Sequence, residues 1–254
     1  MRTPTALSTA ATALAVTAAL ALLGLSASSA TAARSCALPV FGPGTAYHPH
    51  ITPRDFSPSV TNPWFPLKPG RTLVYTGTKD NKKALNIVQT TSRTKVIDGV
   101  RTRVVEDRLY LDNVLEERTS DYYAQDRWGN VWYFGEDTAT LDPQGHVTDT
   151  EGSFHAGVAG AQPGVFMQAH PKVGLKFRQE WYQGHAEDTF NVLSLSAPVT
   201  VRYGTFNNAL KTEETTALEP AVVDNKYFAK GIGEVEEVAV KGPLEKLQLV
   251  EIIQ

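Results

Sequence analysis

Neighbouring carboxylates are the residues of this sequence best suited to do chemistry. Glu136-Asp137 ends an aromatic run, Asp149 and Glu151 open a glycine-rich segment, and Glu187-Asp188 begins a strand-like stretch. If folding brings these groups together, their oxygens suit calcium, which takes oxygen ligands in flexible geometry. Carboxylates beside aromatic rings also suit a glycosidase, which needs two of them across the sugar bond. Adjacent strand residues point to opposite faces, so solvated strand ends are the alternative.

From this set we predict a metal site, with calcium as the candidate cofactor, at Glu136, Asp137, Glu187 and Asp188. Other catalytic patterns are weak. His48-Pro49-His50 puts two imidazoles on one side of an extended segment, but no third metal ligand lies nearby in the sequence. Gly152-Ser153-Phe154-His155 places a serine near a histidine without the G-x-S-x-G pattern of a nucleophile elbow. We therefore predict no catalytic residue.

Aromatic residues concentrate between Asp121 and Thr138, in the run DYYAQDRWGNVWYFGEDT. On a strand, Trp132 and Phe134 share one face while Val131 and Tyr133 share the other, so both faces are apolar. Core packing of a central strand explains this pattern, and so does a ligand-lined concavity or a surface for a protein partner. The predicted ligand-binding residues are Trp132, Phe134, Trp128, Tyr122 and Phe166.

Strand-like runs rich in Val, Ile, Thr and Tyr fill the sequence from Arg71 onward. Asp98-Gly99 separates two of these runs, and a D-G pair in that position is a strong hairpin signal. Turn signals recur at short intervals, as in antiparallel meanders and barrels. The sequence therefore predicts an all-β fold, in which an antiparallel meander forms a strongly curved sheet or a barrel-like domain.

Residues 142–174 interrupt this pattern with glycines, prolines and few β-branched residues. A loop of this length inside a compact domain is uncommon and is usually either functional or disordered. Phe154, Phe166 and Met167 make the segment too apolar for a disordered linker. We expect a long ordered flap packed over one end or face of the sheet, with an insertion that has no ligand role as the alternative.

The N-terminal residues indicate export. Arg2 is the only charge before an Ala/Leu/Val run, and Ala30-Thr31-Ala32 forms a small-residue cleavage site, so residues 1–32 are a predicted signal peptide. Residues 33–60 form a proline-rich leader that we expect to be partly disordered, and residues 61–254 form a single all-β domain. The mature protein is expected to be secreted, with cleavage near Ala32.

Composition narrows the partners. Cys36 is the only cysteine, so an intramolecular disulfide is excluded, and Arg34 just before it disfavours lipid anchoring there. The formal net charge is −3, so the protein lacks the excess of basic residues that is typical of a nucleic-acid-binding protein. After signal cleavage no segment is long and apolar enough to form a transmembrane helix. The sequence gives no signal for an oligomeric state.

Five runs of the sequence carry a resemblance: YYAQDRWGNVWYFGEDT, EGSFHAGVAGAQPGVFM, RQEWYQGHAED, VTVRYGTFNNALKTEETTALEP and KYFAKGIGEVEE. Together, over about residues 61–254, they resemble a family of uncharacterised exported bacterial all-β proteins. It implies a fold and an exported location but no reaction. The family is expected to have acidic or other polar residues where this chain has His155, His170 and His185, which weakens any site built on these histidines.

Two functions from different classes follow. The first is a non-enzymatic binding domain of the cell envelope or secretome, whose curved sheet holds an apolar or amphipathic small molecule. The second is a hydrolase of extracellular carbohydrate that uses convergent carboxylates. A calcium-stabilised structural or interaction domain is a further alternative. A carboxylate pair in a polar cleft would favour the hydrolase, whereas an apolar cavity lined by Trp132 and Phe134 would favour binding.

Overall fold

The computed structural model describes residues 38–254, so the predicted signal peptide and Cys36 lie outside the described residues. Two short 3-10 helices come first, η1 (Gly44–Ala46) and η2 (Pro53–Asp55). The strands are β1 (Phe56–Ser57), β2 (Thr72–Lys79), β3 (Lys82–Ile97), β4 (Val100–Leu111), β5 (Val114–Asp126), β6 (Val131–Leu141), β7 (Val147–Asp149), β8 (Phe154–His155), β9 (Gln162–Met167), β10 (Lys176–Arg178), β11 (Glu180–Trp181), β12 (Asp188–Val201), β13 (Gly204–Thr216), β14 (Val223–Ala229), β15 (Gly233–Lys241) and β16 (Glu245–Ile253). In the described part of the chain, no helix has the length and apolar character needed to cross a membrane.

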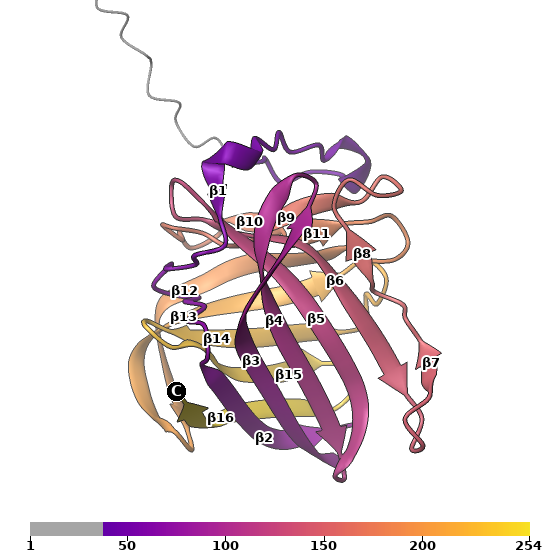
Figure 1. Cartoon of the computed structure of the whole chain (residues 1–254). Helices are drawn as coiled ribbons and strands as arrows, with labels where there is room; N and C mark the ends of the chain where they lie inside the picture. The colour runs from indigo at the N-terminus through magenta and orange to yellow at the C-terminus, as the bar shows by residue number, and fades with distance from the viewer. Residues whose placement is uncertain (1–37) are drawn as a thin grey trace, which may run out of the picture. The chain divides into compact units, whose positions relative to one another are not determined.

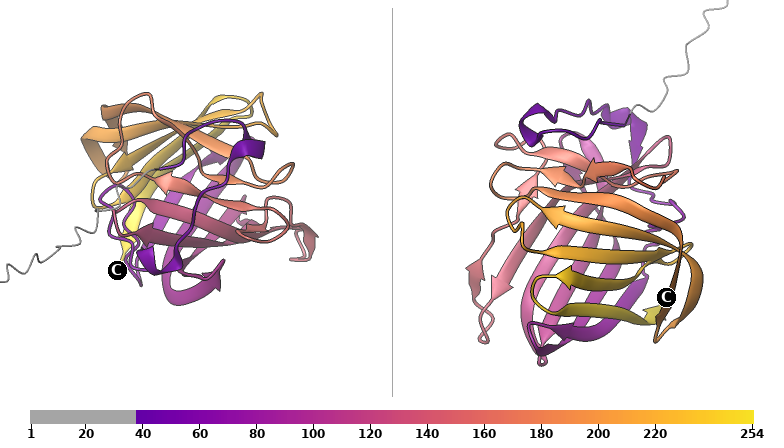
Figure 2. Two further views of the ribbon diagram at one scale, coloured as in Figure 1. Left: turned by 90° about the horizontal axis from the view of Figure 1, so that it is seen from above. Right: turned by 180° about the vertical axis from the view of Figure 1, so that it is seen from behind.

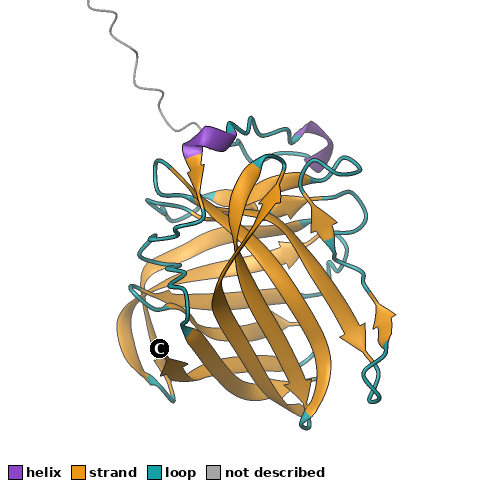
Figure 3. Cartoon of the chain, viewed as in Figure 1, coloured by secondary structure: helices purple, strands orange, loops and turns teal. Residues whose placement is uncertain are grey.

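The strands form one antiparallel sheet that curls into a nearly closed barrel, which confirms the predicted fold class (Figures 1 and 3). Its order is β10-β12-β13-β14-β15-β16-β2-β3-β4-β5-β6-β9-β11. Most neighbours in this order are also neighbours in sequence, as in a meander. The predicted Asp98-Gly99 hairpin is confirmed, since both residues have positive φ (47° and 74°) and join β3 to β4. Positive φ at both positions is typical of the tight turn that matches strand twist.

The sheet ends approach each other through the segment that contains β10 and β11. β10 pairs with β12 at one end of the sheet, while β11 pairs with β9 at the other. Between them, the Gln179 amide donates a 2.8 Å hydrogen bond to the carbonyl of Asp188. A short stretch of chain therefore contacts both ends of the sheet and nearly closes the seam, as the view from behind shows (Figure 2).

Residues 42–47, which belong to the predicted leader, contact the strands of this seam (Figure 1). Tyr47 is 5% exposed and its hydroxyl donates to the carbonyl of Pro163 in β9 at 3.2 Å. Arg178 of β10 donates from Nη2 to the carbonyl of Gly42 at 2.8 Å. Gly44 lies so close to Trp181 of β11 that an added Cβ would meet the indole at 2.0 Å. The segment therefore covers both strands that bring the sheet ends together.

The hairpin of β5 and β6 is central in the sheet, as the two-sided apolar pattern predicts. β6 pairs with β5 on one side and with β7, β8 and β9 on the other. All four residues from Val131 to Phe134 are buried. The predicted flap at residues 142–174 is ordered, and it does more than cover the sheet because its second half supplies β9.

Candidate functional site

A cavity of about 870 Å³ occupies the interior of the barrel. Its lining side chains come from β2–β6, β9 and β11–β16, so most strands of the sheet contribute to it. Sites for small molecules typically have volumes of about 300 to 1,000 Å³. The interior of this barrel is therefore large enough to hold a ligand.

Two carboxylates face each other across neighbouring strands on the wall of this cavity. Asp121 of β5 and Glu136 of β6 are directly opposite in register, and both line the cavity. Side chains at such positions have Cβ atoms about 4.5 to 5.5 Å apart, and like charges there destabilise the sheet. The hydroxyl of Tyr133 donates a 2.6 Å hydrogen bond to Asp121. Asp107 of β4 lines the same wall and accepts from the amide of Asn86.

A β-bulge at Gly135 places Glu136 on this wall. The register shifts between Tyr122 and Tyr123 of β5, so Phe134 and Gly135 occupy the space of one residue. Gly135 has a φ of 150°, and a Cβ there would lie 2.3 Å from the carbonyl oxygen of Phe154. Because of the extra residue, Glu136 faces the same side as Tyr133 rather than the side of Trp132 and Phe134.

The carboxylates of this wall resist ionisation. Burial, followed by repulsion from Asp107, raises the pKa of Asp121 to about 7. Burial also raises the pKa of Asp107 to about 7, opposed by the hydrogen bond from Asn86. Burial and then repulsion from Asp121 raise the pKa of Glu136 well above its usual range. Near neutral pH the three groups together therefore carry less than their full formal charge.

The cations that line the cavity are bound elsewhere. Lys226 contacts Glu214 at 3.0 Å and Glu237 at 3.5 Å, and Lys79 contacts Glu245 at 2.8 Å. Arg71 donates to backbone carbonyls, including that of Pro66 at 2.8 Å. Among the described residues, no ion pair within 4.0 Å involves Asp107, Asp121 or Glu136. Their wall is thus acidic without a protein counter-ion.

Aromatic rings border these carboxylates. Tyr123 and Tyr133 stack with ring centroids 4.8 Å apart. Phe166 of β9 lies 5.0 Å from Tyr123, and Phe65 lies 4.5 Å from Phe166. All four rings line the cavity. The wall therefore combines an apolar aromatic surface with acidic groups that form no ion pair with the described residues.

Exposed lining residues mark where the cavity opens to solvent. They include Glu151, His185 and Leu218-Glu219 in three separate loops, and Asp188 at the start of β12. His185 Nδ1 and Glu151 Oε1 are 2.9 Å apart, so this pair joins the loop before β8 to the loop before β12. A ligand that enters the barrel would pass between these loops.

Of the five residues predicted to bind a ligand, Phe166 alone lines this cavity. Trp132 and Phe134 lie on the other face of β6, where both rings pack edge-on against Phe56 of β1. Trp132 also donates from Nε1 to Asp126 at 3.0 Å. Trp128 lies in the β5–β6 turn, with Arg127 stacked over its ring. Tyr122 points away from the lumen.

The four residues predicted to bind a metal do not come together. Glu136 and Asp188 line the cavity, whereas Asp137 lies on the opposite face of β6 and Glu187 accepts the amide of Gly184 at 2.7 Å. Within residues 38–254, no group of three or more His, Cys, Asp or Glu side chains is arranged to hold a metal.

Asp137 instead belongs to a compact ionic cluster outside the barrel. Lys95 and His155 each lie 2.9 Å from its carboxylate, and the Tyr122 hydroxyl donates to it. Burial alone would raise the pKa of Asp137, but the hydrogen bonds from Lys95 and Tyr122 lower it. These charges satisfy one another.

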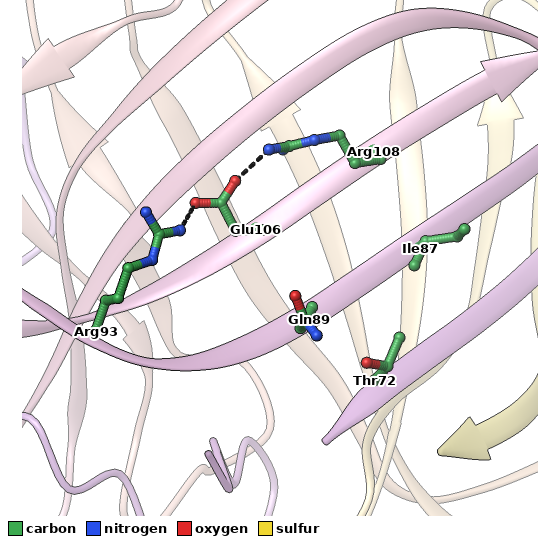
Figure 4. A pocket seen from close by; sticks show the side chains of 6 residues that line it. All are labelled: Thr72, Ile87, Gln89, Arg93, Glu106 and Arg108. Carbon is green, nitrogen blue, oxygen red and sulfur yellow. Dashed lines mark hydrogen bonds and ion pairs between the residues drawn. The ribbon is translucent and has the colours of Figure 1, made fainter. Parts of the chain in front are cut away.

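A second hollow of about 450 Å³ lies on the outer face of β2–β4. Figure 4 shows Glu106 between Arg93 and Arg108, with an ion pair to each. Burial alone would raise the pKa of Glu106, but hydrogen bonds from Arg108 and Arg93 lower it. Glu106 pairs with both arginines but offsets only one of their two charges. The hollow has about half the volume of the lumen, so the lumen is the stronger candidate site.

Comparisons with known proteins add the following. No protein-family model matches the chain, and a search of curated proteins finds no significant match. The fold is similar to a candidate exported protein with a YmcC-like fold from Bacteroides fragilis NCTC 9343, at 12% identity and a TM-score of 0.43, over 75% of this chain and 99% of that chain. It is also similar to a candidate lipoprotein from Parabacteroides distasonis ATCC 8503, at 8% identity and a TM-score of 0.40, over 75% and 98%. These likenesses are distant, so a function must be argued from the cavity itself.

Proposed function

We propose that this protein is a non-enzymatic, exported binding domain that holds a small amphipathic molecule inside its barrel. The observation that carries the proposal is the cavity of about 870 Å³, whose wall joins aromatic rings to polar groups. Ligand sites are typically concave and mostly apolar, with a few polar groups that fix orientation. Tyr123, Tyr133 and Phe166 supply an aromatic part of this surface. The rest of the lining is more polar than in a typical ligand site, with Asp107, Asp121 and Glu136 on the same wall.

Export is the second part of this proposal. It rests on the basic, apolar and small-residue regions of residues 1–32, which have the order of a secretory signal. N-terminal sequencing of the protein from its own host tests it. A mature chain that begins near residue 33 supports export, whereas an intact Met1 in the cytosol contradicts it.

Native mass spectrometry of protein purified from its own host tests binding directly. We expect a retained small molecule, and the same spectra would reveal calcium. Val88→Phe fills the cavity because Val88 lines it, and should reduce the ligand-bound fraction. Val96→Phe is the matched control on the same strand, since Val96 is 62% exposed. Equal occupancy in both variants, or no bound molecule in the wild type, would contradict ligand storage in the lumen.

A carboxylate-dependent hydrolase of extracellular carbohydrate is a second candidate. The facing pair Asp121 and Glu136 and the largely polar lining around it favour this candidate, and Trp132 and Phe134 do not line the cavity. The stacked Tyr123 and Tyr133 beside Phe166 favour binding. Retaining glycosidases use two carboxyl groups about 5 to 5.5 Å apart, one of them with a raised pKa. Turnover of aryl glycosides that disappears in Glu136→Gln would support hydrolysis. Binding of a small molecule without turnover of these glycosides would support the non-enzymatic binding function.

A further inference from the structure

We infer that the molecule held in the lumen is an organic cation, whose ammonium-type group lies between Asp121 and Glu136 and whose apolar part lies on the Tyr123–Tyr133 wall. This inference rests on the proposed binding function and adds the chemical class of the ligand. Its basis is the combination of a walled cavity, a facing pair of carboxylates and an aromatic surface, which come from β5, β6 and β9.

The facing pair is a costly arrangement for the empty protein. Asp121 and Glu136 occupy directly opposite positions, and the β-bulge at Gly135 is what brings Glu136 to the lumen side. Like charges in direct cross-strand register repel each other, so the empty protein can ionise both groups only at a cost in stability. A cation between them would remove this repulsion and stabilise both ionised groups.

No protein cation is placed to do this in the described chain. Lys226 and Lys79 already bind glutamates, and Arg71 donates to backbone carbonyls. Glu180, which is 4% exposed and lines the same cavity, has only the amide of Asp188 as a hydrogen-bond partner among the described residues. The acidic surface of the lumen therefore exceeds what its own cations neutralise, and a cationic ligand would complete it.

The aromatic wall fits the rest of such a ligand. Tyr123 and Tyr133 are stacked 4.8 Å apart and both line the cavity, next to Phe166. Aromatic faces attract organic cations, most strongly where water is excluded. A simple inorganic ion would use the carboxylates but leave this wall unused.

Three probes of equal length separate charge from apolar contact. We would titrate octylamine, octanol and octanoate into the protein at pH 8 by calorimetry, where octylamine is an ammonium ion. Octylammonium should bind about tenfold or more tightly than octanol, and octanoate should bind most weakly. The double variant Asp121→Asn/Glu136→Gln should lose this preference while its octanol affinity stays the same. Glu251→Gln, an exposed carboxylate on β16, is the control and should behave as the wild type.

The outcomes distinguish the two proposals. Equal binding of octylammonium and octanol, or a preference for octanoate, overturns the cationic ligand but leaves binding in the lumen intact. A preference for octylammonium that survives the double variant places the cation elsewhere and also overturns the inference. Failure of all three probes, in a protein that carries no ligand from its host, counts against both proposals. Circular dichroism of the double variant confirms that it is folded, which we expect because both changes remove buried charge.

Discussion

At the scale of a single residue, the buried carboxylate of Asp121 lowers the stability of the folded protein at neutral and alkaline pH. Its pKa is raised to about 7, chiefly by burial and then by Asp107. A folded-state pKa above the unfolded value means that the folded protein binds more protons, so this group contributes more stability as pH falls from about 7 toward about 4. Above pH 7 the folded state instead holds a disfavoured charge. The acid that we assign to ligand binding therefore weakens the empty protein at neutral and alkaline pH.

Asp121→Asn should consequently stabilise the protein at pH 8, by on the order of 1 kcal/mol in the free energy of unfolding. The asparagine carbonyl can still accept the hydrogen bond from Tyr133. At pH 4 the gain should disappear because the wild-type carboxyl is already protonated. Urea unfolding at both pH values measures this, with Glu251→Gln as the exposed control. A loss of stability at pH 8 would show that the carboxylate has a partner that neutralises it.

At the scale of elements, β6 shows which features the sequence can predict. Its aromatic run predicts a central strand buried on both faces, and the Asp98-Gly99 pair predicts the β3–β4 turn; both are observed. Strict alternation from Trp132 would put Glu136 on the same face as Phe134. The bulge at Gly135 reverses this. The close approach of Phe154 to Gly135 is a contact between distant residues, which alternation along one strand does not contain. The alternation of side chains along β6 therefore could not predict that Tyr133, Glu136 and Asp121 share one wall of the cavity. The glycine inside this apolar strand is nevertheless a sequence signal for a bulge.

Gly135→Ala tests the importance of this bulge. An added Cβ would meet the carbonyl of Phe154 at 2.3 Å, in a backbone conformation that side chains rarely adopt. We expect a loss of about 3 kcal/mol or more and faster amide exchange in β8, since backbone atoms must move apart. Gly145→Ala is the matched control, because its φ is also positive (86°) but nothing lies within 4 Å of the added Cβ. Equal losses in the two variants would mean that backbone conformation, and not the contact with Phe154, sets the cost.

At the scale of the whole molecule, closure of the barrel depends on pairings between distant parts of the chain. β10 and β11 are three and two residues long, and residues 42–47 pack on them and on β9. Short strands gain little from local propensity, so their pairing depends on the tertiary contacts around them. The prolines of this segment predict extended chain, but no local signal shows that it packs on the seam. The seam is thus the part of the fold that depends most on the N-terminal segment.

Gly44→Val should weaken the seam while leaving the rest of the barrel folded. Its side chain would collide with the ring of Trp181 at 2.0 Å and push the segment away from β11. Because β9–β11 would lose their cover, their amides should exchange faster. The amides of β2–β4, which lie in the middle of the strand order and away from the seam, should keep their protection. Gly42→Val, two residues away with open space around its added Cβ, is the control and should leave exchange unchanged. Equally faster amide exchange in all strands would show instead that the seam and the barrel unfold as one cooperative unit. The N-terminal segment would then stabilise the whole barrel rather than its seam.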